Sequence, residues 1–127
     1  MDLGPRPLAP NIRVERWVPL DDLLPRLDAM VTVGGPGTLL AALQADVPVV
    51  VIPFNWDHPE TAWRVAETGA GIRLGPRELT PERLRNAVER VLHEPSFRQN
   101  AHRLALSFAR GGGPARAAEL LEALISR

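Results

Sequence analysis

The sequence lacks cysteine, lysine and tyrosine altogether. Without cysteine the chain can form neither a disulfide framework nor a thiolate metal site, which is compatible with a reducing compartment. Because lysine is missing, arginine supplies all 15 basic side chains, and 15 acidic side chains balance them to a net charge of zero. A neutral chain with scattered charges has no broad electrostatic attraction to nucleic acid or to a membrane surface.

Long apolar runs are missing as well. No stretch approaches the length of a membrane span, and the first residues do not follow the charged-then-apolar pattern of a secretory signal. The sequence therefore predicts a cytoplasmic protein with no membrane span. Its 127 residues are enough for one domain with a sizeable core.

Proline is frequent at the start of the chain. Residues 1–10 contain Pro5, Pro7 and Pro10 beside Gly4, a composition typical of an extended lead-in or the remnant of a linker. We expect residues 11–127 to form the folded domain.

Apolar periodicity predicts strands alternating with helices through the first part of this domain. Strands are expected over residues 12–18, 28–33, 48–53 and 71–74, with helices over 20–27, from 38 onward, and over 60–68. Residues 48–53 are β-branched and proline only, as in an interior parallel strand. This order is typical of an α/β fold with an open, parallel, Rossmann-like sheet.

Three helices are expected to end the chain. Thr80 and Pro81 begin the first, Ser96 with Gln99 forms a capping box for the second, and Pro114 opens the third. The third helix is predicted to pack its apolar side inward, through Ala117, Leu120, Leu121 and Leu124.

Functional signals concentrate in the glycine turn, residues 34–37 (Gly-Gly-Pro-Gly), between the predicted strand 28–33 and the helix that follows. Glycine allows a bulky anion to approach the backbone, and a helix N-terminus favours negative charge. The expected guest is a phosphate or diphosphate, to which Thr38 adds a hydroxyl. The alternative is a tight connection in which Thr38 only caps its helix.

Two further features follow predicted strands. Trp17 ends the first strand, and the loop of residues 54–58 follows the third. Ligands of open parallel sheets bind beyond the carboxyl ends of the strands, where all three features are expected to converge.

The order of these motifs resembles the C-terminal, donor-binding half of the GT-B nucleotide-sugar glycosyltransferases that modify natural products and other lipophilic small molecules. The matching segments are residues 11–19 (NIRVERWVP), 23–25 (LLP), 31–38 (VTVGGPGT), 46–53 (DVPVVVIP), 57–59 (DHP), 64–65 (RV) and 69–71 (GAG). They are spread over nearly the whole chain. The resemblance implies a hexosyltransferase domain that uses a UDP- or dTDP-sugar as co-substrate, inverts the anomeric carbon and needs no metal or other cofactor.

The resemblance also implies roles for individual residues. Trp17 and Val18 contact the nucleobase, while Gly35, Gly37 and Thr38 hold the diphosphate. Asp57 and His58 occupy the position of an acid–amide pair that binds the sugar hydroxyls. No catalytic residue is assigned.

Four positions depart from the family pattern. Val33 replaces a histidine that donates to the diphosphate, Ala41 replaces a glutamate that binds the ribose, Thr61 replaces an asparagine, and His58 replaces a glutamine. The resemblance further places the first β-α-β unit and the whole acceptor-binding domain before residue 1. We therefore expect a fragment or half of a split enzyme that is inactive alone and requires the missing domain or a partner chain. Without the first strands, we also expect an exposed sheet edge that favours homodimers.

Other interpretations remain open at this stage. Asp57 with Glu60 matches a capping box, Trp17 could close the core, and Trp56 and Trp63 fit core or surface packing. His93 and His102 are expected to face solvent, and Asp57 with His58 lacks the third ligand of a metal site. A non-catalytic interaction module with a degraded donor site is the main alternative function, and a nucleotide-sugar epimerase is another.

Overall fold

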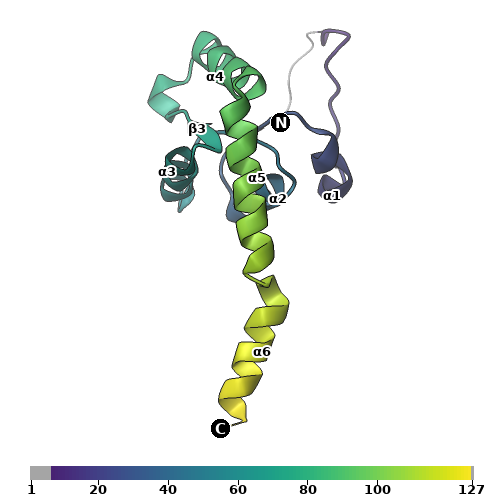
Figure 1. Ribbon diagram of the computed structural model, residues 1–127. Coiled ribbons are helices and arrows are strands. Elements are labelled where there is room, and N and C mark those ends of the chain that lie inside the picture. Colours follow the sequence, from purple (N-terminus) through teal and green to yellow (C-terminus); the bar gives the residue numbers. More distant parts are fainter. Residues whose placement is uncertain (1–6, 127) are drawn as a thin grey trace.

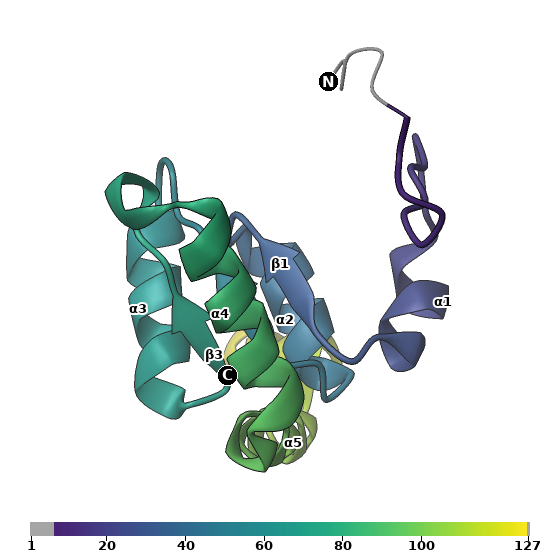
Figure 2. The ribbon, with the colours of Figure 1, turned by 90° about the horizontal axis from the view of Figure 1, so that it is seen from above.

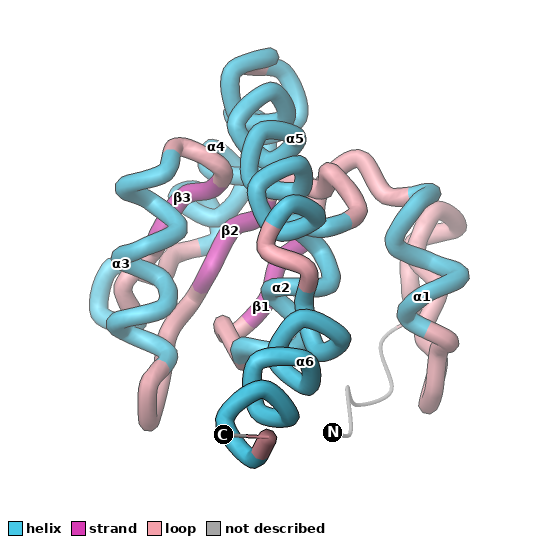
Figure 3. The backbone as a smooth tube through the Cα atoms, turned by 60° about the horizontal axis from the view of Figure 1, so that its bottom comes forward, coloured by secondary structure: helices cyan, strands magenta, loops and turns pink. Residues whose placement is uncertain are grey.

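A parallel sheet of three short strands lies at the centre of the computed structural model, which describes residues 7–126. The strands β1 (Met30–Thr32), β2 (Val49–Val51) and β3 (Gly71–Arg73) lie side by side in that order, as Figure 3 shows. Met30 is paired with Val49, and Val49 with Gly71. The predicted α/β fold with a parallel sheet is confirmed.

Each pair of neighbouring strands is joined by a helix. Helix α2 (Pro36–Gln44) connects β1 to β2, and α3 (His58–Thr68) connects β2 to β3. Parallel neighbours need such crossovers because each strand must start again at the same end of the sheet. Helix α3 ends at the predicted residue, with Gly69 as its C-cap. As a result, the loops that follow β1 and β2 meet at one edge of the sheet.

The central strand separates two apolar layers. Val49 and Val51 are fully buried on the side of α2, α3 and α5 (Pro95–Arg110), whereas Val50 faces α4 (Pro81–His93). Successive side chains of a strand point to opposite faces, so a run of valines supplies both layers. Figure 2 shows the strands between α4 on one side and α2 on the other.

The last two helices form a rod that leaves the body of the molecule (Figure 1). Helix α5 packs on α2, but α6 (Gly113–Ile125) lies beyond the sheet and buries none of its residues. The prediction that α6 packs its leucines inward is wrong: Leu120, Leu121 and Leu124 are 51%, 61% and 66% exposed. Its sequence is amphipathic, yet no described element lies against the apolar side.

The predicted strand over residues 12–18 is also wrong. This segment is irregular and exposed along its whole length, and the described residues contain no strand that pairs with it. Alternation of apolar and charged residues favours a strand only where a neighbour completes the hydrogen-bond ladder. Residues 7–10 of the predicted lead-in are exposed, and residues 1–6 lie outside the described residues.

A short helical segment follows. Helix α1 (Leu20–Leu23) changes at Leu24 into the 3₁₀ helix η1 (Leu24–Arg26), which contains Pro25. Leu24 is buried against the core. The helix expected over residues 20–27 is therefore interrupted beside Pro25, whose ring removes a backbone N–H donor.

The observed N-terminal ends of the later helices agree with the predicted ones only in part. After the 3₁₀ turn η2 (Pro76–Glu78), the Thr80 hydroxyl accepts a hydrogen bond from the Arg83 backbone N–H at 3.2 Å, which confirms it as the N-cap of α4. Helix α5, however, begins at Pro95, so its N-cap is Glu94. The predicted capping box of Ser96 and Gln99 is wrong, because both residues already lie inside the helix.

Candidate functional site

The glycine turn connects β1 to α2. Gly35 is the N-cap of α2 and Pro36 is its first residue, so the interpretation of Thr38 as N-cap is wrong. Gly37 and Thr38 lie in the first helical turn, where backbone N–H groups have no acceptor within the helix. Pro36 has no N–H to satisfy, and its fixed backbone angle suits a helix start. The turn thus presents free N–H groups at the positive end of a nine-residue helix.

The glycines of this turn have different surroundings. A Cβ atom added at Gly35 or Gly37 would meet nothing within 4 Å, so the backbone there is open to a ligand. Gly34 has φ +96°, and a Cβ there would lie 2.8 Å from Val51 Cγ1. Gly34 is therefore required by the fold, whereas Gly35 and Gly37 leave access to the helix N-terminus.

The loop after β2 lies against the same turn. A Cβ atom at Gly34 would lie 3.7 Å from both Cβ and the carbonyl oxygen of His58, the first residue of α3. The structure therefore brings together the predicted diphosphate-binding turn and the predicted sugar-binding pair. These segments lie about twenty residues apart in the sequence and meet because both follow parallel strands.

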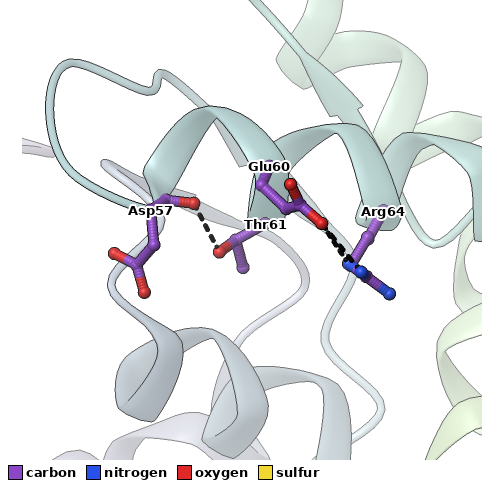
Figure 4. A network of polar contacts seen from close by, with 4 residues as sticks. All are labelled: Asp57, Glu60, Thr61 and Arg64. Atoms are coloured by element: carbon purple, nitrogen blue, oxygen red, sulfur yellow. Dashed lines mark hydrogen bonds and ion pairs between the residues drawn. The ribbon is translucent and has the colours of Figure 1, made fainter.

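Asp57 is the N-cap of α3, but its carboxylate makes no capping hydrogen bond. Instead, the Thr61 hydroxyl donates to the Asp57 carbonyl oxygen at 2.8 Å, and the Glu60 carboxylate accepts from Arg64 Nη2 at 2.7 Å. Figure 4 shows the Asp57 carboxylate directed away from this network. The capping-box interpretation is wrong, and the carboxylate oxygens of Asp57 are free to accept hydrogen bonds from a ligand.

His58 is half-buried beside the turn. Its Nδ1 atom is buried and has no hydrogen-bond partner among the described residues. An unpaired acceptor is tolerated more readily than an unpaired donor, which favours the tautomer that carries its proton on Nε2. In that form His58 offers one N–H donor, as the family's amide does.

Trp17 and Val18 lie apart from this meeting point. Both belong to the irregular segment before α1 and are 78% and 41% exposed. They line an open hollow of about 560 Å³ with Arg13, Glu15 and Leu23, none of which belongs to the glycine turn. Trp17 does not close the core, and its contact with a nucleobase stays a prediction.

A second hollow lies between α2, α3 and α5. It measures about 330 Å³, and most of its lining residues are apolar, among them Leu43 and Phe108. Pro36 of the glycine turn and Thr61 of α3 also line it, so the hollow adjoins the candidate site, but its mainly apolar surface suits an apolar group better than a diphosphate.

Neither a metal cluster nor a membrane span is found in the part of the chain that the structure describes. Residues 7–126 contain no group of three or more metal-ligating side chains and no helix long and apolar enough to cross a bilayer. His93 and His102 are both exposed, as predicted, and His102 Nδ1 lies 3.0 Å from an Asp46 carboxylate oxygen.

Comparison with known proteins supplies the family. Residues 3–124 match the family described as "Erythromycin biosynthesis protein CIII-like, C-terminal domain". The chain belongs to this family. Curated relatives include 4'-demethylrebeccamycin synthase of Lentzea aerocolonigenes, 43% identical over 94% of this chain, and demethyllactenocin mycarosyltransferase of Streptomyces fradiae, 41% identical over 98%.

Solved structures of family relatives have the same fold. The calicheamicin glycosyltransferase superposes with a TM-score of 0.86 at 38% identity, over 95% of this chain and 32% of its own. Glycosyltransferase VinC, solved in complex with dTDP, superposes with a TM-score of 0.78 at 38% identity, over 81% of this chain and 26% of its own. The chain spans only 28% and 27% of the two curated relatives. The match is therefore to one domain of longer enzymes.

Proposed function

We propose that this chain is the donor-binding part of a glycosyltransferase that transfers a hexose from a dTDP- or UDP-sugar to a natural-product acceptor. The observation that carries the proposal is the meeting of an open glycine turn with the Asp57–His58 pair in a chain of this family. Similarity to VinC, which was solved with dTDP, supports a nucleoside diphosphate as the ligand.

In this proposal the turn binds the diphosphate. The free N–H groups of Gly37 and Thr38, with the Thr38 hydroxyl, donate to the phosphate oxygens, and Gly35 allows their approach. Negative charge grows on the departing diphosphate as the glycosidic bond breaks, and fixed donors in this position stabilise it. The sugar is inverted at its anomeric carbon, and no step requires a metal.

The second loop orients the sugar. The unengaged Asp57 carboxylate accepts hydrogen bonds from sugar hydroxyls, and His58 donates one through Nε2. Trp17 and Val18 complete the site by covering the nucleobase with an apolar surface. The acceptor and the base that deprotonates it belong to a further domain.

Three departures from the family pattern predict weak binding. Val33 offers no donor, and the side chain of Ala41 is packed against the core instead of reaching a ribose. The Thr61 hydroxyl is already engaged by the carbonyl oxygen of Asp57 at 2.8 Å. We therefore expect a measurable but weak interaction with the donor.

Calorimetry with dTDP, UDP and NAD tests the proposal directly. Binding of the nucleoside diphosphates without binding of NAD is the expected result. Binding of NAD instead would favour another enzyme on a similar sheet. No binding of any of the three would favour an interaction module that has lost the donor site.

A further inference from the structure

Two unfavourable features coincide at Trp56. Its side chain is 91% exposed, which leaves a large apolar ring in water. Its backbone has φ +58°, a left-handed conformation that is strained for a bulky residue. Among the described residues Asp46 is the other non-glycine with positive φ, and aspartate tolerates this conformation far better. Backbone strain of this kind clusters at active sites and ligand-binding segments.

The position of Trp56 connects it to the candidate donor site. Trp56 immediately precedes Asp57 and lies two residues before His58, which lies beside the glycine turn. Two residues span at most about 7 Å, so the indole is anchored within reach of a sugar whose diphosphate occupies the turn. Neighbouring Phe54 is 53% exposed, and the loop of residues 54–57 is exposed throughout.

We propose that Trp56 is a sugar-binding residue that stacks its indole on the C–H face of the donor hexose, an inference that rests on the proposed function. A pyranose ring carries hydroxyls at its rim and C–H groups on its faces. Asp57 and His58 supply hydrogen-bonding groups for the rim, and a flat apolar ring next to them complements the face. The left-handed backbone holds the indole out of the protein core, where a ligand can reach it.

In this role Trp56 contacts the sugar of the donor and not its nucleotide. Nucleotide and diphosphate contacts come from other residues, so the loss of the indole should affect only ligands that carry a sugar. Trp63, on α3, is 54% exposed and offers a matched control, because its replacement removes an exposed indole from the helix that follows the Trp56 loop.

The test compares dTDP with dTDP-glucose on the purified chain, by calorimetry and by proton NMR of the ligand. We expect dTDP-glucose to bind about two- to tenfold more tightly than dTDP, with upfield shifts of the sugar C–H signals from the indole ring current. Trp56→Ala should reduce the affinity difference, because Asp57 and His58 still contact the sugar, and should abolish the shifts while dTDP affinity is unchanged. Trp56→Phe should restore part of each, and Trp63→Ala should change neither.

The outcomes are distinguishable. Persistence of the full affinity difference and of the upfield shifts in Trp56→Ala would overturn the stacking role and leave the proposed function intact. Failure of the unaltered chain to bind dTDP at all would overturn the proposed function, and the stacking role with it. Circular dichroism of each variant tests whether the fold is retained. We expect that it is, because both tryptophans are exposed.

Discussion

Residue by residue, the glycine turn combines positions that the fold restricts with positions that a ligand can use. Gly34 is confined by Val51 and by its own φ of +96°, while Gly35 and Gly37 have open space before them. Val33, just ahead of the turn, is 49% exposed and lies where the family has a histidine. These differences allow substitutions that alter ligand contacts without disturbing the core.

Val33→His should tighten dTDP or UDP binding. An imidazole at this position can donate a hydrogen bond to a phosphate oxygen, worth roughly 1.5–3 kcal/mol or about ten- to a hundredfold in affinity, less the cost of ordering the ring. The gain should increase below about pH 6.5, where histidine becomes cationic. Calorimetry above and below about pH 6.5 measures this gain in affinity.

Val31→His is a matched control, since Val31 is 45% exposed but lies within β1, farther from the turn. It should leave the affinity nearly unchanged. A flat affinity for Val33→His at every pH, with the fold retained, would mean that position 33 does not face a phosphate and would favour a purely structural turn.

Gly37→Val should abolish nucleoside diphosphate binding. The added side chain enters space that is free in the protein, so the fold should survive, but it blocks the approach of a phosphate to the first turn of α2. Ala66→Val, at an exposed position of α3, is the control and should bind normally. Unchanged affinity in a folded Gly37→Val chain would refute the assignment of the turn as a phosphate loop.

Among the secondary-structure elements, β3 depends on a glycine for close packing. A Cβ atom at Gly71 would lie 2.4 Å from the Val49 carbonyl oxygen and 2.8 Å from Val65 Cγ1. The first is backbone in the central strand and the second is a buried side chain of α3, so neither can move away easily. The sheet and helix α3 can approach each other this closely only because position 71 has no side chain.

Gly71→Ala should therefore destabilise the chain by about 3 kcal/mol, at the upper end of the usual cost of overpacking. Urea unfolding followed by circular dichroism measures the change. Gly37→Ala, with nothing within 4 Å of the added methyl, should be neutral or slightly stabilising because alanine favours a helix. Equal stabilities of the two variants would contradict this account of the packing of β3.

For the molecule as a whole, we expect activity to depend on an acceptor site that the described residues do not supply. An acceptor must be positioned and deprotonated for attack, and the described residues supply no base within a second wall of a cleft. We expect the purified chain to give no glycosyl transfer from a dTDP- or UDP-sugar to a phenolic or macrolide acceptor, as followed by mass spectrometry. Turnover above the rate without protein would refute this expectation.

The whole molecule also exposes apolar surface on two sides. Val31 at the β1 edge is 45% exposed, and Leu121 and Leu124 on α6 are 61% and 66% exposed. Exposed strand edges and apolar helix faces favour association between chains. Sedimentation of the purified chain should therefore show dimers or larger assemblies.

The double variant Leu121→Glu with Leu124→Glu should weaken this association without loss of helix, since both side chains are exposed. Glu119→Gln, on the same helix, changes charge without removing apolar surface and should have little effect. A stable monomer of the unaltered chain at high concentration would count against the association.

Local patterns in the sequence determined most of the elements. The β-branched run before Pro53, the cap at Thr80 and the end of α3 at Gly69 were predicted because each depends on residues a few positions apart. The family motifs likewise located the glycine turn and the pair Asp57–His58. Which of these groups have free hydrogen-bonding capacity could not be read from spacing alone.

Only the tertiary structure decided which neighbours cover the apolar side of each element. The amphipathic α6 and the alternating residues 12–18 both predict buried sides, but burial requires a neighbour, and the described residues supply none. Asp57 and Glu60 have the spacing of a capping box, yet the Glu60 carboxylate accepts from Arg64 and Asp57 is left uncommitted. Periodicity encodes which side of an element is apolar, whereas long-range packing determines what covers that side and which polar groups remain available to a ligand.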